Sequence, residues 1–158
     1  ENNLKATLFL THSVIQDDPE YFNKFAKAGY PIENHTVSHD TMMVDHMSYE
    51  QMYQDICRMS DYIHKQYGKR PELFRPPGGA YNDIMRKAVA DCGMKAIVTW
   101  IAKVDDGAVQ YQIGDTLRPG DIVLMHFRPK FHEDIQAFVA AQKKAGLTTV
   151  LLENWLVP

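Results

Sequence analysis

Apolar residues recur along the chain with two different spacings, and the two spacings alternate from one end to the other. Short apolar runs predict strands at 5–11, 30–34, 72–75, 95–100, 120–127 and 148–155. Stretches whose apolar residues lie three or four positions apart predict helices at 17–29, 48–68, 82–93 and 133–146. Strands that alternate with helices of this length predict an α/β fold, in which helices cover a parallel sheet.

Capping residues mark several of the predicted helices. The helix at 48–68 has Ser48 as a possible N-cap and Gly68 as a stop residue. Its apolar residues recur at helical spacing, at Met52, Ile56, Met59 and Ile63. Asn82 is the candidate N-cap of the helix at 82–93. These markers support the helix assignments independently of the apolar pattern.

Length and composition limit the class of protein. We predict one domain, 1–158, because 158 residues are enough to bury a sizeable core. The apolar share is 45 % and the net charge is −3, so electrostatics gives no argument for nucleic acid or an anionic membrane surface as a partner. We expect no membrane span, because no apolar run approaches the roughly 18 residues that one needs.

The two cysteines give little information about function. Cys57 and Cys92 do not have the spacing of metal ligands. They fix neither the redox compartment nor a disulfide, and we interpret them as two buried, inert thiols.

Polar residues follow several of the predicted strands directly. His35 and His39 come after the strand at 30–34, and Arg75 ends the strand at 72–75. The residues that follow or end later strands are Asp105, Asp106 and His126. Ligands gather at the C-terminal ends of the strands in parallel α/β folds. We therefore expect these residues to converge on one face of the molecule.

His35 and His39 are candidate metal ligands. Their spacing of four residues would place both imidazoles on the same side of a helical turn, and neutral imidazole is a common ligand of zinc. The alternative is a polar helix start that Thr36 or Ser38 caps. Two histidines are also too few to complete a catalytic zinc site, because a catalytic zinc usually takes three protein ligands and keeps one position open for water.

The segment "FRPPGGAYND" contains a second candidate group. Pro76 and Pro77 stiffen the chain after Arg75, and Gly78 and Gly79 let the backbone approach a ligand closely. Such a loop suits the positioning of a substrate, although an ordinary surface arginine before a turn has the same sequence.

His126 and Asp106 are each ambiguous when taken alone. His126 lies in a run of Ile, Val, Leu and Met, where a histidine is either a catalyst or a hydrogen-bonded core residue. Asp106 in "VDDG" is either a site residue or a turn residue.

The order of these segments resembles that of a known family. "HTVSH", "RPPGG", "WIAKVDDG" and "IVLMH" are similar, in this order, to four of the five motifs of the polysaccharide deacetylases of carbohydrate esterase family four. The resemblance covers nearly the whole chain, because "KATLFLT" and "KKAGLTTVLLENWL" are also similar to family segments. It implies a distorted (β/α) barrel and the hydrolysis of acetyl groups from a sugar.

The resemblance also implies roles for individual residues. His35 and His39 would hold a divalent metal, zinc first and cobalt or another transition metal as alternatives, with Thr36 or Ser38 supporting their loop. His126 would protonate the leaving group, and Asp106 would orient His126. Arg75 would orient the carboxylate that acts as the base.

The same resemblance implies the substrate contacts and the partners. Leu124 would line the pocket of the acetyl methyl, backbone N–H near Gly78 would stabilise the oxyanion, and Tyr81 and Trp100 would contact the sugar. The substrate would be an acetylated glycan such as peptidoglycan, chitin or xylan. The complete domain would be a monomer, outside the cell or associated with its envelope. Gly78 and Gly107 stand where many relatives have tyrosine and tryptophan, which leaves the substrate preference open.

The chain departs from the family at its first motif. That motif, Thr-Phe-Asp-Asp-Gly, supplies the catalytic base and the third metal ligand, but only "ENNL" precedes the strand at 5–11. We therefore expect the first strand and the first helix to be missing, the parent protein to be active, and these residues alone to be weak or inactive. If another residue serves as the base, the first candidates are His12, Asp40 and Asp105.

Two further functions stay open at this point. One is a non-catalytic module that binds glycan through aromatic residues. The other is a metal-dependent hydrolase of the same architecture that acts on amides other than sugars.

Overall fold

The computed structural model of the protein describes residues 3–156, which form two compact units. The larger unit contains residues 5–98 and 150–156, and the smaller unit contains residues 3–4 and 99–149. That the chain is a single domain stays a prediction. No helix within residues 3–156 combines the length and the apolar character that a membrane span needs.

The larger unit is built on a sheet of parallel strands. These are β1 (Leu8–Leu10), β2 (Ile32–Asn34), β3 (Leu73–Phe74) and β4 (Ala96–Ile97), side by side in that order. Each neighbouring pair is parallel, which confirms the prediction, and each strand is shorter than the predicted run. Asn34, the last residue of β2, is in register with Leu10 on one side and Phe74 on the other. The loop that follows β2 therefore starts from the middle of the sheet.

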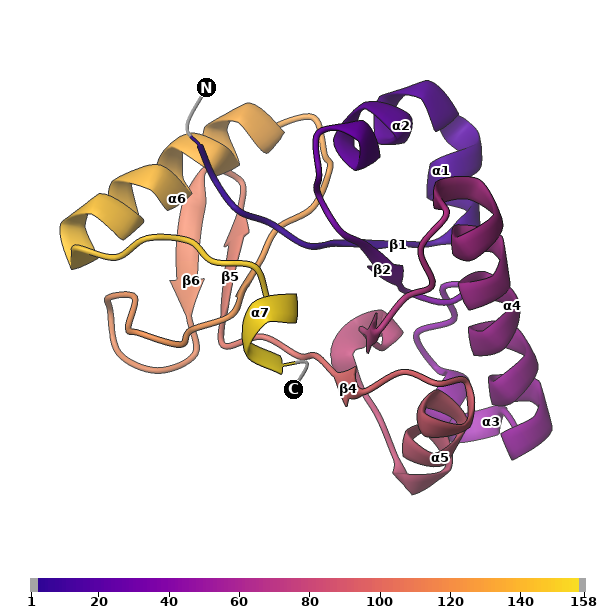
Figure 1. Ribbon diagram of the computed structural model, residues 1–158. Helices are drawn as coiled ribbons and strands as arrows, with labels where there is room; N and C mark the ends of the chain where they lie inside the picture. The colour runs from indigo at the N-terminus through magenta and orange to yellow at the C-terminus, as the bar shows by residue number, and fades with distance from the viewer. Residues whose placement is uncertain (1–2, 157–158) are drawn as a thin grey trace. The chain divides into compact units, whose positions relative to one another are not determined.

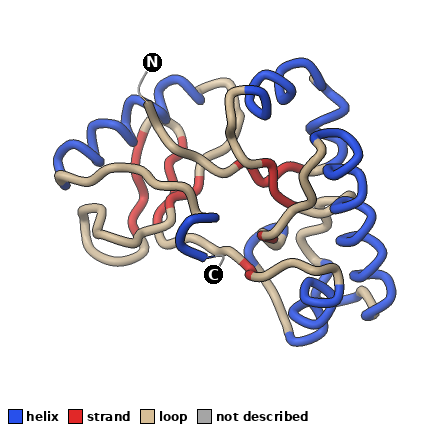
Figure 2. Tube along the Cα trace, in the orientation of Figure 1, coloured by secondary structure: helices blue, strands red, loops and turns tan. Residues whose placement is uncertain are grey.

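Helices surround this sheet, and most of them begin at a capping residue (Figures 1 and 2). They are α1 (His12–Asp17), α2 (Pro19–Lys27), α3 (Met43–His46), α4 (Tyr49–Tyr67), α5 (Asp83–Asp91) and α7 (Glu153–Leu156), with a 3-10 turn, η1, at Pro77–Gly79. Ser48 and Gln51 form a reciprocal capping box at the start of α4, and Gly68 ends the helix in the left-handed conformation. Asn82 caps α5. The predicted caps are thus confirmed, whereas the short helices α1 and α3 were not predicted.

The helix α4 contributes to both clusters of buried apolar side chains in this unit. Met52 and Ile56 belong to the cluster that contains Phe74, and Met59 and Ile63 belong to the cluster that contains the residues of β1. All four α4 side chains are fully buried. Since burial of one such side chain stabilises the fold by about 1.5–3 kcal/mol, α4 is held firmly along its whole length.

The smaller unit is a three-stranded sheet with one helix. β5 (Ala102–Asp105) pairs antiparallel with β6 (Ala108–Tyr111) and parallel with β7 (Val123–Leu124), and α6 (Phe131–Ala145) packs on β5 and β6. Asp106 and Gly107 form the hairpin turn with φ of 56° and 76°, the backbone that a two-residue Asp-Gly turn adopts. The turn in "VDDG" is confirmed. The hairpin itself was not predicted, because 108–111 is mostly exposed and lacks a strong apolar run.

The predicted strand at 148–155 is wrong. The residues from 147 to 152 pair with no strand, and α7 begins at Glu153. Leu151 and Leu152 accept backbone hydrogen bonds from Asn154 and Trp155, so the apolar run ends in a helical turn. Strand propensity gives a strand only where a neighbouring strand is available for pairing.

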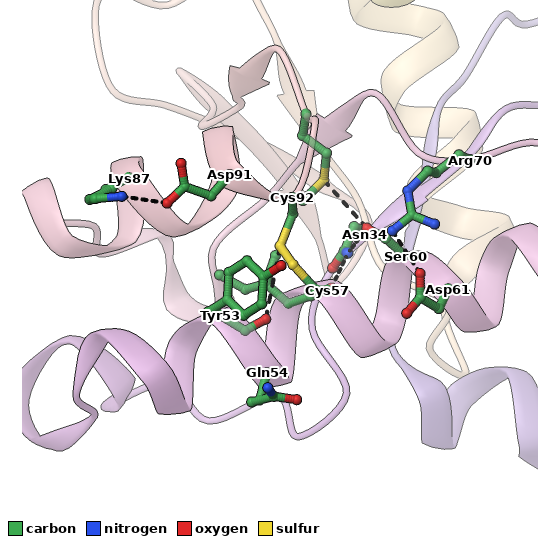
Figure 3. The surroundings of a disulfide bond; sticks show 12 residues. Asn34, Tyr53, Gln54, Cys57, Ser60, Asp61, Arg70, Lys87, Asp91 and Cys92 are labelled. Atoms are coloured by element: carbon green, nitrogen blue, oxygen red, sulfur yellow. Dashed lines mark hydrogen bonds and ion pairs between the residues drawn. A yellow bond between two sulfur atoms is a disulfide. The ribbon is translucent and has the colours of Figure 1, made fainter.

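The interpretation of Cys57 and Cys92 as free thiols is also wrong. The two residues form a disulfide between α4 and the C-terminal end of α5, with their Cα atoms 5.4 Å apart (Figure 3). Nothing in the sequence spacing indicates this pair, because the contact depends on how the two helices pack. The disulfide ties α5 to the helix that contributes to both buried clusters of this unit.

Candidate functional site

The loop that carries the two histidines has an irregular backbone. Residues 35–40 contain a bend at 37–38 and lack the helical turn that the spacing predicted. Thr36 has φ of 72° and His39 has φ of 54°, both in the left-handed region. The two imidazole rings nevertheless lie side by side, with their centroids 4.9 Å apart. The predicted adjacency of His35 and His39 is confirmed, although the backbone that produces it was predicted wrongly.

The hydrogen bond of His35 fixes its tautomer. Its Nδ1 lies 2.6 Å from the backbone carbonyl oxygen of Arg75, and a carbonyl can only accept. Nδ1 therefore carries a proton and donates the hydrogen bond, and in the neutral ring this leaves the lone pair on Nε2. A histidine that ligates a metal commonly has this arrangement, in which the second ring nitrogen donates to a carbonyl or a carboxylate.

Thr36 and Asn34 hold the turn around His39. The backbone N–H of His39 donates to Oγ1 of Thr36 at 2.9 Å, and the N–H of Thr36 donates to Oδ1 of Asn34 at 2.8 Å. Thr36 and Asn34 are fully buried. The Asn34 amide donates in turn to the carbonyl of Ile56 and to Oγ of Ser60, both at 2.8 Å, so the loop is joined to α4 (Figure 3). Thr36 thus supports the loop through its hydroxyl oxygen, which caps the turn by accepting from the N–H of His39.

Arg75 is a buried residue and not an ordinary surface arginine. It is 7 % exposed, its Nε donates to the carbonyl of Val98 at 3.2 Å, and its guanidinium lies 4.3 Å from the ring centroid of Phe9. Burial lowers the pKa of Arg75 to about 10, so the side chain is still cationic at neutral pH. Arg75, which directly follows β3, thus places a fixed positive charge at the end of that strand. Its backbone carbonyl orients His35.

The loop after Arg75 has the tight geometry that its glycines predict. Gly78 has φ of 68° in the turn η1, and a Cβ at this position would lie 3.4 Å from Cβ of Thr41. Any other residue would be strained there. A role of the Gly78 backbone in binding an oxyanion stays a prediction.

Tyr81 lies at the wall of a cavity in the larger unit. The cavity has a volume of about 390 Å³ between α5 and β4, and it is lined by Tyr81, Arg86, Val89, Ala90, Met94, Lys95, Ala96 and Ile97. Tyr81 is 45 % exposed, and the guanidinium of Arg86 lies 5.0 Å from the centre of its ring. The aromatic face is thus partly used by a cation, and a sugar contact at Tyr81 stays a prediction.

Two carboxylates of the smaller unit have cationic partners. Asp105 accepts hydrogen bonds from Arg128 at 2.9 Å and Lys103 at 3.3 Å, with Arg128 the stronger cause of the lowered pKa of its carboxyl. Asp106 forms an ion pair with Lys130, and its side chain is 73 % exposed. The proposed orientation of His126 by Asp106 stays a prediction.

The remaining candidates of the smaller unit lie on or near β7. Leu124 is buried on this strand, and His126 lies two residues beyond it and is partly buried. Trp100 lines a second cavity of about 290 Å³, together with Thr99, Ile101, Gly120, Asp121 and Ile122. The histidine pair and Arg75 belong to the larger unit, so the convergence of both sets on one face stays a prediction.

The donor set of the histidine pair fits a divalent transition metal. One imidazole has a fixed lone pair, and the second lies beside it. Across residues 3–156, however, no three histidine, cysteine or acidic side chains are placed to hold one ion together. The pair therefore accounts for two protein ligands of such a site.

The alternative candidates for the base have other contacts. Asp40 accepts hydrogen bonds from the N–H of Met42 and from His46, and the bond from Met42 contributes most to the lowered pKa of its carboxyl. His12 packs edge-on against Tyr62, with ring centroids 4.5 Å apart. Asp105 has the two cationic partners described above. A base role for any of the three stays a prediction.

Two of the four motifs, those with the histidine pair and Arg75, lie within a segment that matches a known family. A sequence model of polysaccharide deacetylases matches residues 1–97. The chain belongs to the polysaccharide deacetylase family. It is 37 % identical over 125 residues to an uncharacterised protein of Streptomyces coelicolor, covering 78 % of this chain and 49 % of that protein. It is 30 % identical over 129 residues to a peptidoglycan-N-acetylglucosamine deacetylase of Bacillus cereus, covering 77 % and 59 %. The chain thus spans about half the length of these relatives.

Solved structures confirm the fold class. A family 4 carbohydrate esterase from Streptomyces lividans, in complex with acetate, matches with a TM-score of 0.74 and 25 % identity over 94 % of this chain and 79 % of that one. A family 4 pseudoenzyme from Bacillus anthracis matches with a TM-score of 0.80 and 20 % identity, covering 98 % and 56 %. The mixed α/β fold of this chain is therefore that of the family 4 carbohydrate esterases.

Sequence reasoning missed the residues that hold the histidine loop. Asn34 precedes the motif, and Asp55 lies on α4, where its side chain accepts from Ser38. Their types and spacing are common in any α/β protein. The one sequence indication is that Asp55 lies one residue before the apolar Ile56, on the boundary of the buried face of a helix.

Proposed function

We propose that the protein containing this chain removes acetyl groups hydrolytically from a carbohydrate polymer, with a cell-wall polymer of N-acetylglucosamine as the substrate class. The single observation that carries the proposal is the histidine pair, whose rings are adjacent and whose first member has its Nε2 lone pair fixed by the Arg75 carbonyl. Family membership supports the reaction type. The deacetylase of Bacillus cereus, which is named for peptidoglycan N-acetylglucosamine, supports the substrate class.

In this proposal, Nε2 of His35 and the imidazole of His39 hold a divalent metal, zinc first. A metal bound there would polarise the acetyl carbonyl and lower the pKa of a water molecule. Hydrolysis adds water across the acetyl C–N bond and gives acetate and a free amine. His126 donates the proton to the leaving nitrogen, and Asp106 orients His126.

The residues around the reacting group have binding roles in the same proposal. Leu124 lines the pocket of the acetyl methyl, and the backbone N–H groups near Gly78 donate to the oxyanion. Arg75 supplies a fixed positive charge that orients the catalytic carboxylate. Tyr81 and Trp100 contact the sugar rings.

We also propose that the protein acts outside the cytoplasm, at the cell envelope. The Cys57–Cys92 disulfide supports this location, because disulfides form and persist in oxidising compartments. A polymeric wall substrate would be found in the same place.

Metal content and turnover of the full-length protein test the proposal together. The wild type should retain zinc and release acetate from acetylated chitooligosaccharides, and His39→Ala should lose both properties. His64→Ala is the matched control, because His64 is an exposed residue of α4 outside the loop. Equal metal content in His39→Ala and in the wild type would contradict the assignment of the metal site to the histidine pair. Activity assays with acetylxylan and small amides as further substrates would define the substrate class.

Two observations favour a second function. Within residues 3–156 no side chains complete a three-ligand site, and one of the matching structures is described as a pseudoenzyme. A glycan-binding module without activity has these properties. A full-length protein that binds chitooligosaccharides but neither retains zinc nor releases acetate would support this alternative.

A further inference from the structure

The histidine loop adopts a backbone that its residues do not favour. Thr36 and His39 both have positive φ, and Thr36 is β-branched, for which this region is a true outlier. Such conformations persist only where surrounding contacts hold them, and they concentrate at functional sites. The contacts that hold this loop are therefore part of what places the two imidazoles.

One residue of α4 accepts hydrogen bonds from the segment between the two histidines. Oδ1 of Asp55 accepts from the N–H of Ser38 at 3.1 Å, and Oδ2 accepts from Oγ of Ser38 at 2.8 Å. The backbone carbonyl of Asp55 accepts from the N–H of Val37 at 3.3 Å. Both carboxylate oxygens are thus directed at the residue that precedes His39.

The position of Asp55 is itself fixed. Its neighbours Met52, Ile56 and Met59 on α4 are fully buried. Asn34, the residue just before His35, donates hydrogen bonds from its side-chain amide to Ile56 and Ser60 of the same helix. The loop is therefore attached to α4 on both sides of His35, by Asn34 before it and by Asp55 after it.

We propose that Asp55 is a positioning residue of the histidine pair, and that its carboxylate sets the distance and orientation of the His39 ring relative to the His35 ring. The metal that this pair would hold rests on the proposed function, whereas the placement of the rings does not. Neither the sequence motif nor the family comparison points to this residue.

The variants of Asp55 should form an ordered series. Asp55→Ala removes both acceptors, while Asp55→Asn keeps one oxygen that can accept from the Ser38 N–H. Removal of residues that orient metal ligands typically lowers metal affinity about 10- to 100-fold. We expect Asp55→Ala to fall in this range and Asp55→Asn to lose less. Ser38→Ala combined with Asp55→Ala should add to Asp55→Ala only the loss of the bond from the Asp40 N–H to Ser38 Oγ, because the contact between Ser38 and Asp55 is already broken.

The first measurement uses the full-length protein without metal, by NMR. The wild type should show a nuclear Overhauser contact between the His35 and His39 rings and slow exchange of the Ser38 amide. Asp55→Ala should weaken the ring contact and speed up that exchange. Asp61→Ala is the control, because Asp61 is an exposed residue of the same helix that pairs with Arg70 at 2.7 Å. An unchanged ring contact in Asp55→Ala, with Ser38 exchanging at the wild-type rate, overturns the proposal.

The second measurement is zinc affinity, by competition with a chelator. It should fall in Asp55→Ala, less in Asp55→Asn, and not in Asp61→Ala. If the wild type binds no zinc, the proposed function fails while the NMR series still decides the role of Asp55. If Asp55→Ala does not fold, Asp55→Asn and Ser38→Ala carry the same comparison, and normal ring contacts in both overturn the proposal.

Discussion

The two units hold their candidate residues in different ways. In the larger unit, Asn34 and Thr36 hold the histidine loop by buried, uncharged hydrogen bonds, to which the Asp55 carboxylate adds two bonds from Ser38. In the smaller unit, Asp105 and Asp106 are held by ion pairs with long, exposed cationic side chains. Buried bonds resist salt and competition from water, whereas exposed ion pairs are screened and weak. The candidate residues of the larger unit are thus held in a fixed arrangement. The arrangement of Asp105 and Asp106 in the smaller unit depends on solution conditions such as salt concentration.

The largest expected effect concerns the Cys57–Cys92 disulfide, which joins α5 to α4, the helix to which the histidine loop is attached. Cys57→Ser combined with Cys92→Ser opens a loop of 35 residues and should lower the free energy of unfolding by about 4 kcal/mol in the chain-entropy model. Urea unfolding followed by circular dichroism measures the loss. Since the bond ties α4 to α5, a variant as stable as the wild type would show that α4 does not depend on this attachment.

Asn34→Ala tests the buried bonds directly. It leaves the N–H of Thr36 buried without its acceptor and removes the bonds from the Asn34 amide to the Ile56 carbonyl and to Ser60 Oγ. We expect a loss of roughly 3 kcal/mol in the free energy of unfolding, since each buried group without a partner costs about 1–3 kcal/mol. Thermal unfolding in low and high salt should give the same loss, whereas a salt-dependent loss would contradict the contrast between the units.

A buried carboxyl group gives the larger unit a pH dependence. Glu33 on β2 is 1 % exposed and accepts from the backbone N–H groups of Glu72 and Leu73. Burial is the main cause that raises its pKa to about 8, and a hydrogen bond and repulsion from Glu153 on α7 add to it. Between about pH 4.5 and 8 the folded state therefore binds one proton more than the unfolded state. Stability should fall as the pH rises through this range, by up to about 1.4 kcal/mol per pH unit.

Glu33→Gln should flatten this part of the pH profile of stability, because a neutral amide cannot ionise. Glu50→Gln is a suitable control, since Glu50 is exposed in the first turn of α4. Denaturant titrations at pH 5, 6, 7 and 8 measure the slope. The same slope in Glu33→Gln and in the wild type would show that another group causes it.

The smallest expected effect is in the smaller unit. Lys130→Ala removes the partner of Asp106, and we expect no measurable change in melting temperature, because the pair is exposed. A clear drop in melting temperature at low salt would show that the hairpin turn depends on this charge pair and would weaken the comparison.

The sequence predicted those parts of the fold that local patterns determine. The apolar spacing of α4 and the caps Ser48 and Asn82 locate long helices, because a helix makes its own hydrogen bonds. The strands β3 and β4 are short, and α7 replaced a predicted strand, because pairing depends on residues far away in the chain. The turn at Asp106 was found, but its β6 strand was not, since its side chains are mostly exposed.

The candidate site also divides into features that local sequence determines and features that depend on contacts between distant segments. The chemical types of His35, His39 and Arg75 are visible as motifs. Their geometry is not, because the positive φ of Thr36 and the acceptor role of Asp55 depend on the contact between a loop and a helix. The disulfide belongs to this second class for the same reason.

The clustering of these contacts on one stretch of α4 makes that stretch sensitive to insertions and deletions. Asp55, Ile56, Cys57 and Ser60 lie within six consecutive positions and contact three partners, Ser38, Asn34 and Cys92. One inserted residue after Ile56 would rotate everything beyond it by about 100° around the helix axis. Ser60 and Cys57 would then turn away from Asn34 and Cys92, while Asp55 kept its place. Substitutions on the exposed face of this helix do not change the directions in which these four side chains point. The number of residues between Asp55 and Ser60 is therefore more constrained than the residue types on the exposed face.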